Sequence, residues 1–155
     1  LIEAGKKSHE GGIDLGFVGE IKKVNPELIM VLLKQGFLPV VSPIGLGKDG
    51  VTYNINADTT ASRIAVSLGA YKIIFMTDVD GVLEKDKLCA QLTSSEVEKM
   101  IQKKIITGGM SPKADAGLYC VKNGVESAQI INGTEPHSVI AELFTDQGIG
   151  TKIVL

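Results

Sequence analysis

The first candidate for chemistry is Asn54-Ile55-Asn56-Ala57-Asp58, where two amides and a carboxylate separate an apolar run from an alanine-rich one. If the apolar run is a strand, its alternation puts Asn54 and Asn56 on the same face. Asp58 then opens the following helix. Two amides can orient a polar substrate, and a carboxylate in this position can hold a lysine or a metal ion. The alternative is that Asn56 or Asp58 only caps the helix.

The second candidate is an acidic turn that directly follows a strongly apolar run. Ligands of parallel sheets bind outside the carboxyl ends of the strands, so this turn suits the base and ribose of a nucleotide. Its acids also suit Mg²⁺, although their spacing matches no EF-hand loop. The alternative is a polar turn at a sheet edge. The turn consists of Thr77, Asp78, Val79, Asp80, Gly81, Val82 and Leu83.

The third candidate combines paired glycines with a lysine, in Thr107-Gly108-Gly109-Met110-Ser111-Pro112-Lys113. Paired glycines ahead of a helix can turn backbone N–H groups toward a phosphate. Lys113 is expected at the start of that helix, where a cation opposes the macrodipole. An anion between the lysine and the helix end would explain this placement. A solvated lysine is the alternative, and the pattern is not a Walker A motif because GxxxxGK[ST] is absent.

Length and composition exclude several classes of protein. A chain of 155 residues is one domain or one half of a larger protein. Its net charge of −2 offers no basic excess for a nucleic-acid backbone. No apolar run approaches the roughly 20 residues that cross a bilayer. We therefore expect neither a nucleic-acid partner nor a membrane span.

The cysteines and histidines indicate no metal site and no nucleophilic triad. Cys89 and Cys120 are far apart in the chain, without a CxxC pattern or a suitably spaced histidine. Two reduced thiols are typical of a cytoplasmic protein. His9 is expected at the surface, and His137 is expected to be solvated or to cap the last helix.

Short apolar runs alternate with helical patterns along the chain, which indicates βαβ units. The predicted fold class is α/β, with helices on both faces of a mostly parallel sheet. A Thr93–Glu96 capping box opens one helix, and Gly36 and Gly124 end two others. Part of 13–18 could be a strand, and residues 85–87 a hairpin tip. The other expected strands are 37–45, 51–56, 71–77, 125–131 and 150–155, and the expected helices are 26–35, 57–68, 94–103, 113–121 and 135–144.

Taken together, these motifs resemble the ATP-binding half of the acetylglutamate kinases, a branch of the amino-acid kinase family. The resemblance covers essentially the whole chain, and YNINAD together with ITGGMSPK is its most specific part. The matching segments are DLGFVGEI (14–21), PVVSPIG (39–45), YNINAD (53–58), TDVDGVL (77–83), ITGGMSPK (106–113) and ELFTDQGIGT (142–151).

The resemblance implies a three-layer αβα sandwich around a mostly parallel open sheet. It also implies phosphorylation of the γ-carboxylate of N-acetyl-L-glutamate in arginine biosynthesis, with ATP and with Mg²⁺ bound through ATP. Lys113 would stabilise the transferring phosphoryl group, Asp58 would organise the catalytic lysines, and Asn54 and Asn56 would bind the substrate. The ATP pocket would be lined by Thr77, Asp78, Val79, Asp80, Gly81, Val82, Leu83, Ile105, Ile106, Thr107, Gly108 and Gly109.

Family members also have an N-terminal half with a glycine-rich phosphate loop, a second catalytic lysine and an arginine for the substrate carboxylate. None of these occurs in this sequence. Residues 1–155 are therefore expected to be the nucleotide-binding half, inactive alone, of an enzyme that is a homo-oligomer at full length.

The ending of the chain is typical of arginine-inhibited members. It implies an L-arginine effector site near Glu142 and Gly148. Two other interpretations stay open. One is a kinase for a related amino-acid derivative such as an aminoadipate, and the other is a non-catalytic nucleotide- or arginine-binding regulatory module.

Overall fold

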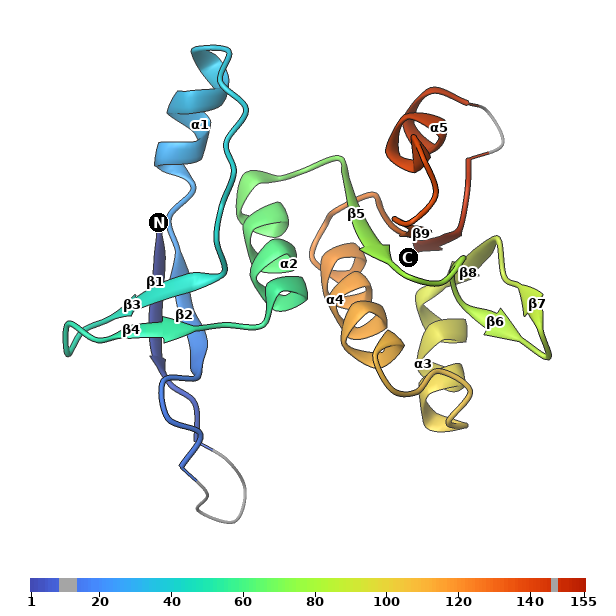
Figure 1. Cartoon of the computed structure of the whole chain (residues 1–155), viewed down its shortest axis with the longest axis horizontal. Helices are drawn as coiled ribbons and strands as arrows, with labels where there is room; N and C mark the ends of the chain where they lie inside the picture. Colours follow the sequence, from blue (N-terminus) through green and yellow to red (C-terminus); the bar gives the residue numbers. More distant parts are fainter. Residues whose placement is uncertain (9–13, 146–147) are drawn as a thin grey trace. The chain divides into compact units, whose positions relative to one another are not determined.

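The computed structural model describes residues 1–8, 14–145 and 148–155, so His9, Ile13 and two positions of the 142–151 motif lie outside the described residues. The chain forms two compact units, which we call unit 1 (Leu1–Leu68) and unit 2 (Gly69–Leu155). Figure 1 labels their helices and strands. Each unit has its own sheet and helices, so the α/β class predicted from the sequence is confirmed.

Unit 1 contains a four-stranded mixed sheet in the order β2-β1-β3-β4. Its core forms on one face, where Ile2, Ala4, Tyr53 and Ile55 pack together and Ile64 of α2 packs against them. Glu3 and Leu46 alternate with the core residues and belong to the opposite face, on which Leu46 is 58% exposed. The elements are β1 (Ile2–Lys6), β2 (Gly19–Val24), α1 (Glu27–Lys34), β3 (Ile44–Gly47), β4 (Thr52–Asn54) and α2 (Ala57–Leu68).

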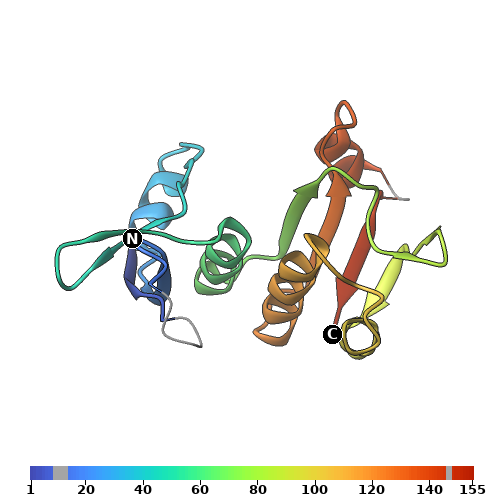
Figure 2. The same ribbon diagram turned by 60° about the horizontal axis from the view of Figure 1, so that its bottom comes forward.

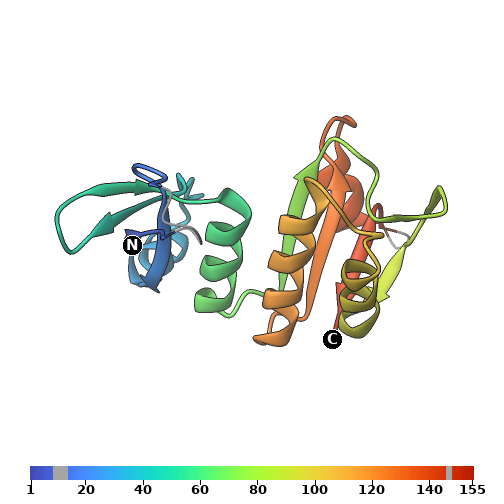
Figure 3. The same ribbon diagram turned by 90° about the horizontal axis from the view of Figure 1, so that it is seen from below.

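Unit 2 is built around a second mixed sheet, in the order β5-β9-β10-β8. Helices α3 and α4 cover one face of this sheet and α5 lies on the other (Figures 2 and 3). The inner strand β9 is buried along nearly its whole length, as expected for a strand covered on both faces. The elements are β5 (Lys72–Thr77), β6 (Leu83–Glu84), β7 (Lys87–Leu88), β8 (Gln91–Thr93), α3 (Ser94–Gln102), α4 (Met110–Lys122), β9 (Ser127–Asn132), α5 (Ser138–Phe144) and β10 (Thr151–Val154).

The direction of the strands brings the candidate loops of unit 2 together. Strands β5 and β9 are parallel, and their last residues, Thr77 and Asn132, are partners in the register. The segments that leave the two strands therefore start at the same edge of the sheet. The first turn of α4 lies at this same end of unit 2 (Figure 3).

Several local predictions are confirmed by backbone geometry. Gly36 and Gly124, which were expected to end helices, have φ angles of +78° and +94°. Lys85 and Asp86, also in the left-handed region, form the tip of the β6–β7 hairpin. The backbone conformations of these helix ends and of this hairpin tip depend mainly on neighbouring residues, which is why the sequence predicts them well.

Three predictions require correction. The strand expected over 37–45 is wrong for most of its length, because pairing begins only at Ile44. Pro39 and Pro43 lack the N–H group that a strand ladder needs. Helix α4 begins at Met110, so Lys113 lies in its first turn rather than at its start. The unit 1 sheet is mixed rather than mostly parallel, because its β1–β2 and β3–β4 pairs are antiparallel. In the unit 2 sheet the β5–β9 and β8–β10 pairs are parallel, as predicted, and the β9–β10 pair is antiparallel.

No helix in the described part of the chain is both long and apolar enough to cross a membrane.

The capping box of α3 allows a test of local stability. Thr93 Oγ1 accepts a hydrogen bond from Glu96 N, and Glu96 Oε2 accepts one from Thr93 N at 2.7 Å. We expect Thr93→Ala to lower the free energy of unfolding by about 1 kcal/mol, because a backbone N–H at the helix start loses its acceptor. Urea denaturation of the two proteins measures this difference.

The same box predicts a dependence on pH. Hydrogen bonds from Thr93 lower the pKa of Glu96 below its ordinary value of 4.5. The stability contributed by this shift is therefore complete above that value and is lost as the pH falls through the lowered pKa. Glu96→Gln should reduce the loss of stability in acid, whereas Glu98→Gln, on the same helix but outside the box, should not. Equal acid sensitivity of the wild type and Glu96→Gln would contradict this account.

Candidate functional site

The acidic turn after β5, which we call the nucleotide loop (residues 77–83), is exposed at its tip and buried at its end. Asp78, Val79 and Asp80 are exposed, whereas Gly81 and Val82 are buried. Asn132 Nδ2 donates to Asp80 Oδ1 at 2.9 Å, and Gly133 N donates to Thr77 O at 2.7 Å. The segment after β9 therefore holds the loop in a defined position.

The glycine loop (residues 105–109) joins α3 to α4 in the same unit. Ile106 is only 3% exposed and anchors it, whereas Thr107, Gly108 and Gly109 are exposed. Gly108 has a φ of +58°, which favours glycine. Gly109 is the N-cap of α4, and the first turn of this helix contains no acidic residue. The helix start is therefore positive, with the half-buried Lys113 in its first turn.

These placements bring two of the candidate loops to the same end of unit 2. The nucleotide loop leaves β5 at the edge where β9 also ends, and α4 starts at that end (Figure 3). A helix N-terminus with a nearby lysine attracts a polyanion, and the loop at the strand end offers polar groups for the rest of a nucleotide. Lys113 and all the residues predicted for ATP thus belong to unit 2.

The residues predicted for the substrate belong to unit 1. Asn54, the last residue of β4, and Asn56 are exposed on either side of the buried Ile55. Asn56 Oδ1 accepts hydrogen bonds from Thr59 N at 2.9 Å and Thr59 Oγ1 at 3.2 Å, so this oxygen caps α2. Asp58 is half-buried in the first turn of the same helix.

Backbone contacts connect the segment before β2 to β4. Asn54 N donates to Phe17 O at 2.8 Å, and Val18 forms a parallel bridge with Asn54. The segment before β2 therefore fixes the end of β4 from which the candidate substrate residues follow.

A polar cavity in unit 2 contains both residues predicted for an effector. It measures about 410 Å³, and Glu142 and Gly148 are among its lining residues. The Glu142 side chain is buried, lies 2.6 Å from Lys72 Nζ and accepts a hydrogen bond from Ile149 N at 2.9 Å. A Cβ on Gly148, whose φ is +57°, would approach Glu142 Oε2 to 2.8 Å, so only glycine fits this position well.

Sequence reasoning missed the other residues that line this cavity, among them Lys72, Gln129 and Lys152. Gln129 is 3% exposed and donates through Nε2 to Ile149 O at 2.5 Å. Its Oε1 atom is buried and has no hydrogen-bond donor among the described residues. The available signal was a polar residue next to the apolar stretch of each of two strands, Lys72 before Ile73–Met76 in β5 and Gln129 before Ile130 and Ile131 in β9.

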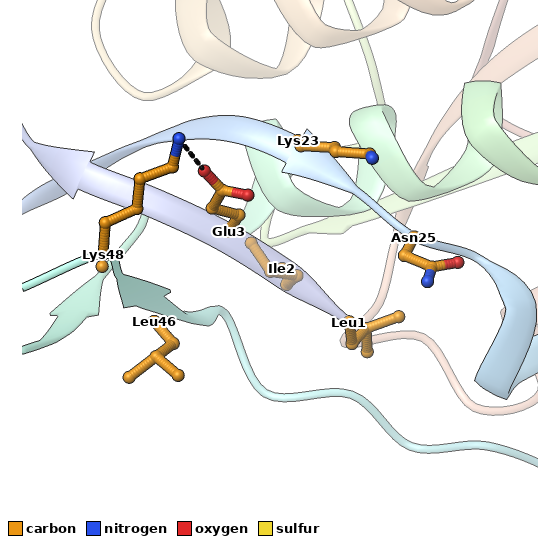
Figure 4. A pocket seen from close by; sticks show the side chains of 8 residues that line it. Leu1, Ile2, Glu3, Lys23, Asn25, Leu46 and Lys48 are labelled. Atoms are coloured by element: carbon orange, nitrogen blue, oxygen red, sulfur yellow. Dashed lines mark ion pairs between the residues drawn. The ribbon is translucent and has the colours of Figure 1, made fainter. Parts of the chain in front are cut away.

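A further hollow lies in unit 1 and was not predicted. It measures about 410 Å³ and is lined by residues of β1, β3 and the end of β2. Figure 4 shows Lys48 reaching toward Glu3 across it, with 3.5 Å between their charged atoms. Lys48 is largely exposed, so this ion pair contributes little to stability.

His137 is exposed and has left-handed backbone angles at the start of α5, without a capping hydrogen bond from its side chain. It is therefore a solvated residue, one of the two roles predicted for it.

Known proteins resemble this chain over most of its length. Residues 1–132 match the amino acid kinase family. Acetylglutamate kinase of Halothermothrix orenii is 51% identical over 160 residues, which cover 99% of this chain and 55% of the relative. Acetylglutamate kinase of Archaeoglobus fulgidus is 51% identical over 152 residues, which cover 96% of this chain and 52% of the relative. The chain thus spans about half the length of the curated relatives it matches.

A solved structure supports the fold. N-acetylglutamate synthase from Neisseria gonorrhoeae, crystallised with coenzyme A and L-arginine, superposes with a TM-score of 0.91 at 28% identity. The match covers 99% of this chain and 36% of the synthase. Sequence and structure together lead to one conclusion: the chain belongs to the amino acid kinase family.

Proposed function

We propose that the full-length protein transfers the γ-phosphoryl group of ATP to the γ-carboxylate of N-acetyl-L-glutamate. This chain would supply the ATP site and part of the catalytic site. The observation that carries the proposal is the common position of the nucleotide loop and the first turn of α4 at one end of the unit 2 sheet. The 51% identity to acetylglutamate kinases supports the choice of substrate.

The proposed chemistry requires charge neutralisation rather than a general base. A γ-carboxyl group with a pKa of about 4.3 is already ionised at neutral pH. One of its oxygens forms a bond to the γ-phosphorus while the bond from that phosphorus to the β–γ bridging oxygen breaks. The products are an acyl phosphate and ADP. Because two anions must approach each other, Lys113 and the N–H groups at the start of α4 would neutralise the phosphoryl oxygens.

We further propose that Mg²⁺ enters with ATP. In kinases this ion usually binds through phosphates and one or two carboxylates, and it stabilises the charge on the transferring group. Asp78, at the carboxyl end of β5, is an acid of the required type. Among the described residues, no group of three or more His, Cys, Asp or Glu side chains gathers to hold a metal.

A second half of the protein is also proposed, because unit 1 leaves many apolar side chains uncovered. Leu38 and Val40 are 88% and 94% exposed. Many large apolar side chains exposed on one unit are typical of a surface that another part of the protein covers. We propose that the remaining part of the full-length protein covers these residues and supplies the rest of the substrate site. The others that are exposed in unit 1 include Leu28, Val31, Phe37, Ile44 and Leu46.

The test is an assay of the full-length protein with MgATP and N-acetyl-L-glutamate, in which hydroxylamine traps the acyl phosphate. We expect turnover with acetylglutamate and a much lower rate with an acetylated aminoadipate. The reverse preference would favour a kinase for the related acid, and binding of nucleotide without any turnover would favour the regulatory module. The 155-residue chain should bind nucleotide but should not phosphorylate the substrate. Homo-oligomerisation and a cytoplasmic location stay predictions.

A second function, binding of L-arginine as an effector, is favoured by the unit 2 cavity. A guanidinium group needs hydrogen-bond acceptors, and the Glu142 carboxylate, which also pairs with Lys72, lies among the residues that line the cavity. The synthase that superposes on this chain was crystallised with L-arginine.

We expect Glu142→Gln in the full-length protein to weaken L-arginine binding by about tenfold or more, because a charge-assisted hydrogen bond is lost. Calorimetry measures the two dissociation constants. Glu98→Gln, which alters a surface carboxylate paired with Lys122, is the matched control and should bind like the wild type. Absence of arginine binding by the wild-type protein would rule out the effector site.

A further inference from the structure

Thr151, the first residue of β10, is completely buried and contacts the nucleotide loop. Its Oγ1 atom accepts a hydrogen bond from Val82 N at 2.8 Å, which joins residues 69 positions apart in the chain. Val82 is 2% exposed, so solvent has little access to this N–H group. The Thr151 hydroxyl therefore fastens the end of the nucleotide loop to the sheet of unit 2.

Gly81 brings the loop unusually close to the same hydroxyl. A Cβ at position 81 would lie 2.6 Å from Thr151 Oγ1 and 2.8 Å from Leu88 Cδ1. The φ of Gly81 is +145°, a conformation that other residues rarely adopt. The loop thus packs on Thr151 through two successive residues, Gly81 and Val82.

Thr151 is itself held in place. It pairs with Ile130 in the antiparallel register of β9 and β10. Ile149, two residues before Thr151, is held by two hydrogen bonds of its backbone. Its N–H group donates to the Glu142 carboxylate, and its carbonyl oxygen accepts from the Gln129 side chain. The start of β10 is therefore held by the rest of unit 2, and Thr151 in turn holds the nucleotide loop.

We propose that Thr151 is a positioning residue for MgATP, acting through its hydrogen bond to Val82. The hydroxyl keeps the exposed part of the loop, Asp78 to Asp80, in the arrangement that receives the nucleotide. A loop already held in its binding conformation loses less entropy when the ligand binds. This inference rests on the proposed role of the loop in binding ATP.

The test uses the full-length protein and two substitutions of Thr151. Thr151→Val keeps the shape and suits a strand but removes the hydroxyl. It should weaken MgATP binding about tenfold in calorimetry, because the buried Val82 N–H loses its acceptor. Thr151→Ser restores the hydroxyl and should restore the affinity. In steady-state assays the KM for MgATP should rise in Thr151→Val while the KM for N-acetyl-L-glutamate stays unchanged.

Two more variants test whether the loss of MgATP affinity comes from a displaced nucleotide loop or from a general loss of structure. Gly81→Ala displaces the loop from the intact hydroxyl and should weaken MgATP binding as Thr151→Val does. Thr60→Val, in unit 1, removes another buried hydroxyl, one that donates to Asn56 O at 3.0 Å, and should leave MgATP affinity unchanged. If Thr151→Val does not fold, Gly81→Ala and Thr151→Ser still test the contact.

The outcomes distinguish this inference from the proposed function. Wild-type protein that does not bind MgATP overturns both. Binding by the wild type with equal affinity in Thr151→Val, or with equal weakness in Thr151→Ser and Thr151→Val, overturns only the role of Thr151.

Discussion

Lys113→Ala in the full-length protein is expected to lower kcat by about 10²–10³-fold, the usual effect of removing one group that stabilises developing charge. Lys113 lies half-buried in the first turn of α4, where the helix start is already positive. Its ammonium group would interact most strongly with the phosphoryl oxygens in the transition state. The KM for ATP should therefore change much less than kcat, because the rest of the nucleotide keeps its contacts.

The matched control is Lys122→Ala, in the last turn of the same helix. Lys122 pairs with Glu98 on the surface and lies far along the helix from the glycine loop. This variant removes the same charge from the protein and should keep the wild-type kcat. A silent Lys113→Ala would support the regulatory module instead of the kinase. Equal losses in both variants would point to a general effect of charge.

Gly150→Ala is expected to lower the free energy of unfolding by more than about 4 kcal/mol, which is exceptional for a single methyl group. A Cβ at this position would lie 2.1 Å from Ile130 O and 3.0 Å from Ile130 C. Both atoms belong to the backbone of β9, so no side chain can move aside. The clash would separate the start of β10 from β9 and would disturb the cavity that contains Glu142.

Gly124→Ala is the control for Gly150→Ala. It measures the loss of stability that comes from a positive φ angle alone, without a steric clash. Gly124 has a φ of +94°, and no atom outside its immediate neighbours would lie within 4 Å of an added Cβ. Its replacement should cost only about 1–2 kcal/mol, the strain of the backbone conformation. Urea denaturation of both variants measures the difference. Similar values for the two would show that β9 and β10 can separate slightly at little cost.

Much of the candidate site follows from local patterns in the sequence. The glycine loop, the nucleotide loop and the bounds of α2 depend on turn residues, caps and apolar spacing within a few positions. The same is true of the Thr93–Glu96 box, which the structure contains as predicted. The family resemblance then assigned roles to these loops. Those roles stay predictions until the variants are measured.

The errors occur where pairing partners decide the outcome. Strand β1 was not predicted, although Ile2 and Ala4 alternate with more exposed neighbours, because the segment has only five residues and one of them is glycine. Residues 37–43 are apolar enough for a strand but remain outside the sheets. Whether an extended apolar segment joins a sheet depends on a free strand edge, which no local pattern reveals.

The sequence by itself determined the α/β class, the order of most elements, and the residue types in the nucleotide loop and the glycine loop of unit 2. Helix caps, turns and apolar periodicity depend on residues that are close together in the chain, so they can be recognised in the sequence before the fold is known. Only the tertiary structure brought Lys72, Gln129 and Glu142 around one cavity and placed Thr151 against Val82. Such contacts depend on the register of β9 and β10 and on glycines that permit close backbone approach, and these are properties of the folded sheet.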